Sequence, residues 1–242
     1  MEQMVALEWP MKHLCFGANY KVNIMKIPTN WTFDNTDVAA NFDSHVREQL
    51  PWYDIVSNAI AQIGNHYIPE NGVVYDIGAS SGNIEKVLLS TLSDRDVTFI
   101  PIEKSPEMVA TYTGSYNVLA MDATDVEYEP FDFAVCFLSM MFISPHKRIA
   151  LMDALMHNLR DGGAIVIVEK TVPVGGYAST VLSRLTLKEK LNNGASPEDI
   201  INKELSLSGV QRPIDSDKLF ENYKHTEFFR YGECGGYIVE NK

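Results

Sequence analysis

The segment from Val73 to Ile84 constrains the fold more than any other part of this 242-residue chain. It reads Val-Val-Tyr-Asp-Ile-Gly-Ala-Ser-Ser-Gly-Asn-Ile, and apolar residues then recur at helical spacing as far as Leu92. This pattern predicts a strand, a tight glycine loop and the start of a helix. Glycine has no Cβ and adopts positive φ, so a ligand can approach the loop backbone. The free N–H groups at a helix start suit a carboxylate or a phosphate. We therefore expect the chemistry of the protein to lie at this loop.

The spacing of the glycines narrows the class of ligand. A dinucleotide-binding loop requires G-x-G-x-x-G, and a P-loop ends in Gly-Lys-Ser/Thr. Here three residues separate Gly78 from Gly82, and no such tripeptide follows. The pattern that begins at Asp76, Asp-x-Gly-x-x-x-Gly, resembles the first motif of the class I S-adenosylmethionine (SAM) methyltransferases. The resemblance implies that SAM is the cofactor and that the loop backbone holds its methionine part.

Strands and helices alternate after the glycine loop. Apolar runs predict further strands over residues 97–103, 118–123, 131–138 and 164–170. This alternation implies right-handed crossovers and a parallel sheet that binds ligands at the carboxyl ends of its strands. Three acids, Asp76, Glu103 and Asp122, therefore converge on one edge, as an adenosine-containing ligand requires.

The C-terminal region predicts a hairpin. Two β-prone runs, His225–Tyr231 and Gly236–Val239, surround Gly232–Gly235. A reversed last strand is typical of class I methyltransferases and distinguishes them from NAD-binding folds. We therefore expect an α/β fold, a doubly wound Rossmann-like seven-stranded sheet with a reversed C-terminal strand.

Several pieces of the chain together resemble the carboxy-SAM synthases, which feed the modification of the tRNA wobble uridine. They occur in order at Trp31–Asp34, Pro51–Tyr53, Val74–Gly78, Ser105–Met108 and Gly162–Lys170. The resemblance extends from Trp31 to the C-terminus. Together with the glycine loop it predicts these cofactor-binding residues: Tyr53, Asp76, Gly78, Ala79, Ser80, Gly82, Glu103, Lys104, Asp122, Ala123 and Phe137.

Two positions depart from the pattern of that family. Phe137 stands where the family has an Asn, and Glu204 matches, in an ungapped count, the Arg that recognises the extra carboxylate. A carboxylate there would repel a carboxylated cofactor. Lys203 or Arg212 would replace that Arg if the count is shifted. We therefore expect methyl transfer from plain SAM, with a carboxy-SAM synthase and a non-catalytic binding or scaffolding protein as alternatives.

Methyl transfer from SAM is an in-line displacement that requires alignment and exclusion of water. A hydroxyl or amine acceptor also needs a base, for which the candidates are, in order, Glu169, Asp34 and His45. Each has a structural alternative. Glu169 suits a strand-end acid paired with Lys170, Asp34 a turn, and His45 the edge of the core. The segment Cys136–Met141 lacks the motifs of base-amine and cytosine methyltransferases, which favours a small-molecule acceptor.

Composition excludes several other classes. The formal charge is −12 and no basic stripe is present, which disfavours direct binding of nucleic acid. Three separated cysteines and six scattered histidines predict neither a disulfide framework nor a metal site. Neither an 18-residue apolar run nor a signal segment occurs, so we expect a cytoplasmic protein without membrane contact.

The chain length favours one SAM-binding domain over residues 1–242. Within it we expect an N-terminal cover, residues 1–70, and an inserted cap, residues 171–215. Leucines at helical spacing in the cap predict either a roof over the site or a homodimer contact.

Overall fold

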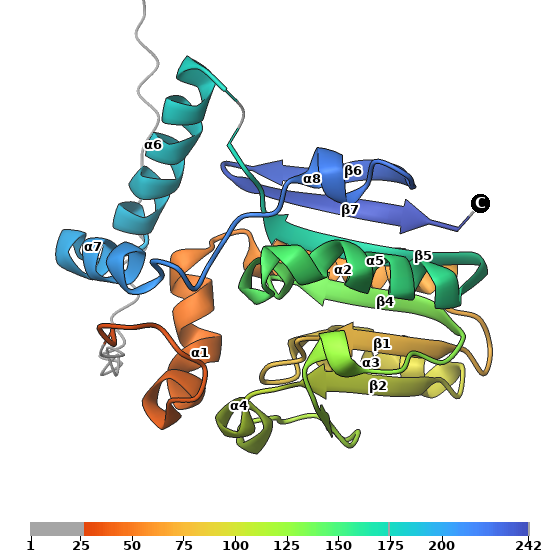
Figure 1. Ribbon diagram of the computed structural model, residues 1–242. Helices are drawn as coiled ribbons and strands as arrows, with labels where there is room; N and C mark the ends of the chain where they lie inside the picture. Colours follow the sequence, from red (N-terminus) through yellow and green to blue (C-terminus); the bar gives the residue numbers. More distant parts are fainter. Residues whose placement is uncertain (1–26, 174, 242) are drawn as a thin grey trace, which may run out of the picture.

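A seven-stranded sheet with helices on both faces forms the centre of the computed structural model (Figure 1), which describes residues 27–173 and 175–241. The strands are β1 (Val73–Ile77), β2 (Thr98–Glu103), β3 (Leu119–Ala120), β4 (Phe131–Phe137), β5 (Leu159–Lys170), β6 (Lys224–Tyr231) and β7 (Cys234–Glu240). The α-helices are α1 (Thr36–Gln49), α2 (Tyr53–Tyr67), α3 (Asn83–Asp94), α4 (Pro106–Ala110), α5 (Pro145–Asn158), α6 (Tyr177–Asn192), α7 (Pro197–Ser206) and α8 (Ser216–Leu219). Two 3₁₀ turns complete the order, η1 (Ala123–Asp125) and η2 (Met140–Phe142).

The strand order is β3-β2-β1-β4-β5-β7-β6. Strands β1 to β5 pair in parallel, and β7 runs antiparallel to both β5 and β6. The predicted fold with its reversed last strand is therefore confirmed. The hairpin turn is shorter than its sequence suggests, because Cys234 and Gly235 already pair with Lys170 and Glu169 of β5.

Alternate residues of the central strands face opposite layers of helices. Tyr75 and Ile77 of β1 pack into the cluster that contains α5, whereas Val74 packs into the cluster that contains α2 and α3. All seven residues of β4 are buried, as its nearly continuous apolar run predicts for a central parallel strand. The rigid sheet therefore fixes the positions of the loops at its carboxyl edge.

Helices α1, α6 and α7 gather beyond the carboxyl ends of the parallel strands (Figure 1). The segment before α1 is hydrogen-bonded to α7. The Trp31 N–H donates to the carbonyl oxygen of Ser206, at the end of α7, at 2.9 Å. The Ser105 hydroxyl donates to the carbonyl oxygen of Phe33, also at 2.9 Å. Within the predicted cover, α2 packs against the sheet and only α1 and the segment before it lie over the edge. Residues 1–26 of that cover, including Cys15, lie outside the described residues.

No helix in residues 27–173 and 175–241 is long and apolar enough to cross a membrane. Among these described residues, no three His, Cys, Asp or Glu side chains group as ligands for a metal ion. Cys136 and Cys234 are free thiols.

Candidate active site

The carboxyl edge of the sheet holds a cleft of about 860 Å³, including space open to solvent. Its floor is the loop after β1, where Gly78 and Ser80 have φ of +80° and +51°. A Cβ on Gly78 would lie 2.6 Å from the Cβ of Ser139. Only glycine therefore lets this loop approach the segment after β4 so closely. We refer to this space as the loop cleft.

Glu103 closes one side of the loop cleft at the end of β2. Its Oε2 accepts the N–H of Ser80 at 3.1 Å, and its Oε1 accepts the N–H of Ser105 at 3.0 Å. Burial raises the pKa of Glu103. The N–H groups of Ser105, Ser80 and Lys104 lower it by less, so the pKa stays above its usual value. These N–H groups do not use the whole acceptor capacity of the carboxylate, so the side chain can still accept from the hydroxyls of a ribose.

Asp122 follows the neighbouring strand β3, at the N-cap of η1. Its carboxylate accepts the N–H of Thr124 at 3.0 Å and the Thr124 hydroxyl at 2.8 Å, and Lys104 Nζ lies 3.7 Å away. Burial alone would raise the pKa of Asp122, but these partners outweigh it and lower the pKa. Asp122 is therefore ionised, and Ala123 and Lys104 line the same cleft.

An aromatic pair forms the wall toward α2. The rings of Tyr53 and Phe137 stack with centroids 4.8 Å apart and 20° between their planes. Both line the loop cleft. Phe137, which departs from the family pattern, therefore contributes a flat apolar surface where an Asn would have offered hydrogen bonds.

The structure does not bring Asp76 and Gly82 into the lining of the loop cleft. Asp76 is 1% exposed, and its Oδ2 has no hydrogen-bond partner. Burial, and after it the carboxylates of Glu103 and Glu85, raise the pKa of Asp76 well above its usual value. A Cβ on Gly82 would meet the ring of Tyr112 at 3.2 Å. Asp76 is therefore buried in the strand before the loop, and Gly82 packs against Tyr112. Both residues support the loop without lining the cleft.

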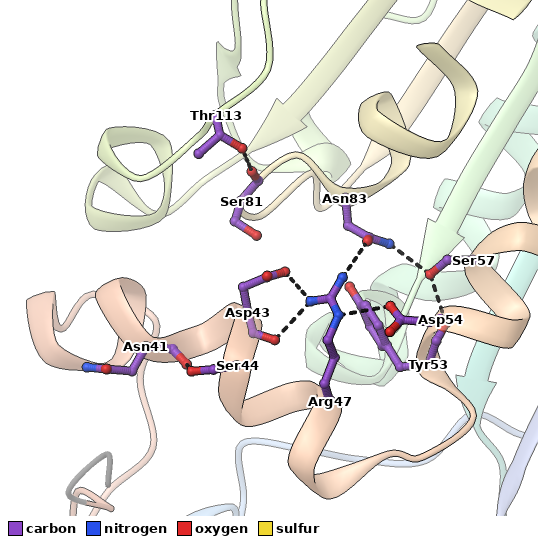
Figure 2. A network of polar contacts seen from close by, with 10 residues as sticks. All are labelled: Asn41, Asp43, Ser44, Arg47, Tyr53, Asp54, Ser57, Ser81, Asn83 and Thr113. Carbon is purple, nitrogen blue, oxygen red and sulfur yellow. Dashed lines mark hydrogen bonds and ion pairs between the residues drawn. The ribbon is translucent and has the colours of Figure 1, made fainter. Parts of the chain in front are cut away.

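Figure 2 shows a network around Arg47 that joins three helices beside the loop. Arg47 Nη1 lies 2.5 Å from Asp43 Oδ1 and Arg47 Nε donates to Asp54 Oδ1 at 2.8 Å. Arg47 Nη2 donates to Asn83 Oδ1 at 3.2 Å, and Asn83 Nδ2 donates to the Ser57 hydroxyl at 2.9 Å. Because Asn83 is the first residue of α3, this network ties α1 and α2 to the helix that the glycine loop enters.

The three candidate bases lie in different environments. Glu169 is 0% exposed and lines neither this cleft nor the cavity described next. Its carboxylate accepts the N–H groups of Ser139, Met140 and Met141 at 2.7, 2.6 and 3.1 Å. It therefore holds the segment after β4, and this arrangement favours the structural alternative for Glu169. Its role as a base stays a prediction.

Asp34 is exposed and lines neither cavity, so the structure does not bring it to the site. His45 of α1 is 8% exposed and lines a second cavity. Burial, and after it Lys203 and Lys190, lower the pKa of His45 to about 4, so its ring is neutral at pH 7. Of the three candidates, only His45 faces a cavity.

This second cavity of about 990 Å³, again including open space, lies between α1, η2 and the cap. We refer to it as the cap compartment. It shares four apolar walls with the loop cleft: Phe33, Phe42, Leu138 and Phe142. A ligand in one space therefore touches the same side chains as a ligand in the other.

Two lysines and Glu204 line the cap compartment. Lys190 Nζ lies 3.0 Å from Glu204 Oε1, while Lys203 Nζ lies over the ring of Trp31. Burial alone would raise the pKa of Glu204, but Lys190 and Lys170 outweigh it and lower that pKa. Burial, and after it Lys190, lower the pKa of Lys203 to about 6. Arg212 lines neither cavity, whereas Lys203 lines the compartment with an amine that is uncharged at pH 7.

Sequence reasoning missed several residues that line the loop cleft. Asn83, Met108, Met121 and Ser139 belong to this group. Asn83 follows Gly82 directly, so its place at the start of the predicted helix was a usable signal. No local sequence signal identified Ser139, because it follows β4 and reaches Gly78, which follows β1, only in the folded sheet.

The loop cleft contains unpartnered polar atoms that suit a polar ligand. The hydroxyls of Ser80 and Ser139 are buried and have no hydrogen-bond partner. Buried polar groups in native proteins are nearly always paired. These hydroxyls, the carboxylates of Glu103 and Asp122 and the exposed loop backbone match a ligand with an amino-acid end and a ribose.

Comparisons with known proteins agree with this geometry. No family model matches the chain. The carboxy-S-adenosyl-L-methionine synthase of Staphylococcus epidermidis is 29% identical over 192 residues, 77% of this chain and 84% of that protein. The synthase of Ruthia magnifica subsp. Calyptogena magnifica is 29% identical over 213 residues, 85% of this chain and 86% of that protein.

Solved structures of methyltransferases share the fold. The plantazolicin methyltransferase in complex with S-adenosylhomocysteine (SAH) has a TM-score of 0.59 at 12% identity, covering 86% of this chain and 91% of that chain. Human N-acetylserotonin methyltransferase in complex with SAM has a TM-score of 0.55 at 12% identity. The match covers 86% of this chain and 56% of the human chain. The resemblance stated from the sequence is confirmed: the chain has the class I SAM-dependent methyltransferase fold and is similar over most of its length to carboxy-SAM synthases.

Proposed function

We propose that this protein binds SAM in the loop cleft and transfers its methyl group to a small-molecule acceptor. The observation that carries the proposal is the convergence of the Gly78–Ser80 backbone, Glu103 and Asp122 on one cleft with unpartnered hydroxyls. In this assignment the loop backbone and Ser80 hold the amino-acid end, and Glu103 accepts the ribose hydroxyls. Asp122 and its neighbour Ala123 lie on the side of the adenine. When bound, SAM supplies a methyl group that its sulfonium has already activated.

The walls shared by the two cavities support a place for the acceptor. Phe33, Phe42 and Phe142 line both the loop cleft and the cap compartment, so they form the boundary between the two spaces. Apolar walls exclude water, which a methyl transfer requires. Residues of the cap also line this compartment, which supports the role of residues 171–215 as a roof in a single-domain protein. Their role in a homodimer stays a prediction.

Calorimetric titration with SAM and SAH tests the proposal. We expect both to bind, and mass spectrometry of ligand retained through purification should detect one of them. Glu103→Gln should weaken SAH binding, whereas Glu127→Gln, an exposed acid lining neither cavity, should not. If neither SAM nor SAH binds to the wild type, the protein is a scaffold with this fold and the proposal fails.

A carboxy-SAM synthase reaction is the second candidate, and the similarity to two named synthases favours it. Lys203 lines the cap compartment but is uncharged at pH 7, and the neighbouring Glu204 would oppose a carboxylated ligand. Titration with carboxy-SAM separates the two candidates. A clear preference for carboxy-SAM over SAM would favour the synthase, and equal or weaker binding would favour the methyltransferase.

A further inference from the structure

The cap compartment holds three buried polar atoms without hydrogen-bond partners. They are Trp31 Nε1, His45 Nε2 and Gln49 Oε1. Trp31 is 3% exposed and His45 is 8% exposed, and all three residues line the compartment. Leaving such groups unpaired is unfavourable, and native proteins usually satisfy them with a ligand or water. These atoms therefore mark one place for a ligand.

The three side chains come from a short stretch of the chain at the end of the compartment. The rings of Trp31 and His45 stack with centroids 5.9 Å apart and 29° between their planes. Gln49 follows His45 by one helical turn of α1, so the two side chains share a face of the helix. The unpartnered atoms thus form a cluster and do not lie scattered over the walls.

The kinds of atom in the cluster define the hydrogen bonds that a ligand must make. The Trp31 indole N–H only donates, and the Gln49 carbonyl oxygen only accepts. The His45 ring is neutral, so one of its nitrogens accepts. A hydroxyl group both accepts from Trp31 and donates to Gln49 or His45, whereas a carboxylate only accepts and would face the Gln49 oxygen.

The charges of the compartment do not favour an anion. Lys170 pairs with Glu233 at 3.3 Å and Lys190 pairs with Glu204 at 3.0 Å. The lining also contains Glu189 and Lys203, and burial lowers the pKa of Lys203 to about 6, so its amine is uncharged at pH 7. Two lysine cations therefore face three glutamates, and the lining gives no net attraction for an anion.

Apart from Thr186 and Gln211, most of the rest of the lining is apolar, and it includes several aromatic rings. Phe33, Phe42 and Phe142 lie on the side of the loop cleft. The Phe33 ring meets Phe42 at 73° and Phe142 at 86°, so these rings present both faces and edges, against which an aromatic ligand can pack. A pocket of this kind, with a few convergent polar groups, is typical of small-molecule sites.

We propose that the cap compartment binds an uncharged, flat small molecule with a hydroxyl group of phenol or enol type. The hydroxyl oxygen accepts from Trp31 Nε1–H, and its hydrogen is donated to Gln49 Oε1 or His45 Nε2. This inference rests on the proposed function, since it names the class of acceptor for the neighbouring loop cleft. It assigns His45, Gln49 and Trp31 as binding residues.

Three ring-matched probes test the assignment by calorimetry on the full chain. 2-Naphthol carries the hydroxyl, 2-methoxynaphthalene lacks the hydrogen, and 2-naphthoate replaces the hydroxyl by a carboxylate. We expect 2-naphthol to bind roughly tenfold more tightly than either of the others, because only it satisfies both an acceptor and a donor of the cluster. Saturating SAH should not displace 2-naphthol, because the two ligands occupy different spaces, and any change in affinity should be the modest coupling expected through the shared walls.

Variants of the cluster locate the binding. His45→Leu combined with Gln49→Met removes both acceptors and should bring 2-naphthol to within about twofold of 2-methoxynaphthalene. His66→Leu is the matched control, because His66 is exposed and lines neither cavity. Gln49→Met alone should lower the preference for 2-naphthol over 2-methoxynaphthalene by a smaller factor. This single variant replaces the double variant in the test if the double variant does not fold.

Several results would overturn the inference. Equal affinities for 2-naphthol and its methyl ether, tighter binding of 2-naphthoate, or a preference that persists when both His45 and Gln49 are replaced, singly or together, would each do so. Displacement of 2-naphthol by SAH would place the probe in the loop cleft. If SAH binds and 2-naphthol does not, the proposed function stands and this inference fails. If 2-naphthol binds and SAH does not, the proposed function fails and the site in the cap compartment remains.

Discussion

The loop cleft and the cap compartment are neighbours with four shared walls, yet they are built in different ways. The loop cleft takes its shape from backbone at the ends of parallel strands, fixed by the buried central strands β1 and β4. The cap compartment takes its shape from side chains of the segment before α1, α1 itself, η2 and the cap. The loop cleft is therefore a feature of the fold, whereas the cap compartment depends on the particular side chains of this protein. We therefore expect substitutions to act on cofactor and acceptor separately.

The largest effect should come from the close approach at the loop. In Gly78→Ala, the new Cβ would meet Ser139 at 2.6 Å while φ is +80°. Unfolding free energy should fall by about 2–4 kcal/mol through strain and displacement of the loop. SAH affinity should fall with it, as calorimetry can measure.

Gly162→Ala is the matched control for the loop. Gly162 also has φ of +80°, but nothing lies within 4 Å of a Cβ there. This variant isolates the strain of positive φ, about 1 kcal/mol, and should keep SAH affinity. Equal losses in the two variants would show that the approach to Ser139 is not what shapes the cleft.

Lys203→Met should stabilise the protein by about 2–3 kcal/mol at pH 7, because burial lowers the pKa of Lys203 to about 6 and each unit corresponds to about 1.4 kcal/mol before relaxation. Between pH 6 and pH 10.5 the unfolded chain binds this proton and the folded chain does not. The unfolding free energy of the wild type therefore rises with pH across this window. The advantage of the variant should shrink as the pH rises.

Urea unfolding at pH 6, 7 and 9 measures this effect. Lys218→Met serves as control, because the side chain of Lys218 is 79% exposed. SAH affinity should not change in Lys203→Met, because Lys203 lines only the cap compartment. A loss of SAH affinity would mean that the two spaces are not separate.

Glu103→Gln should weaken SAH binding by about 1–2 kcal/mol, since a charged acceptor of two ribose hydroxyls is lost. The affinity of the cap compartment for 2-naphthol should be unaffected. Calorimetry with both ligands on one preparation tests this. Unchanged SAH affinity would remove Glu103 from the site.

The same contrast explains what the sequence could predict. Gly78, Glu103 and Asp122 each end or follow a strand, so local pattern and parallel topology place them on one edge. Asp76 shares that pattern and lies on the same face of the sheet as Glu103, since it pairs with Pro101 of β2. Glu103 is the last residue of β2 and stands two residues farther toward the carboxyl edge, so Glu103 reaches the cleft while Asp76 is buried.

The cap compartment could not be predicted in the same way. Lys203 lies far from Trp31 and His45 in sequence, and packing of the segment before α1 against α7 brings them together. The helical pattern of the cap predicted helices but not which side chains face inward. Nothing in the local sequence of Glu169 distinguishes a base at the strand end from an acid that holds the next loop.

Glu169→Gln tests that distinction and should have the smallest effect. Glutamine keeps one oxygen for the N–H groups of Ser139 and Met140 but turns an amide toward the N–H of Met141, at a loss of about 1 kcal/mol. Burial raises the pKa of Glu169 to about 8, although the three N–H groups lower it. The folded chain therefore holds this proton between pH 4.5 and pH 8 and the unfolded chain does not. The contribution of Glu169 to stability is fully present below pH 4.5 and falls as the pH rises to 8.

The stability difference between wild type and Glu169→Gln should accordingly be larger at pH 5 than at pH 8 in urea unfolding. Glu221→Gln, an exposed acid, should show no such trend. Since the segment held by Glu169 leads into walls of both spaces, Leu138 and Phe142, the affinities for SAH and for 2-naphthol should fall by similar factors. A catalytic base would leave both affinities unchanged and lower only turnover. That outcome would return Glu169 to the reaction, whereas a joint loss confirms that it positions the wall between cofactor and acceptor.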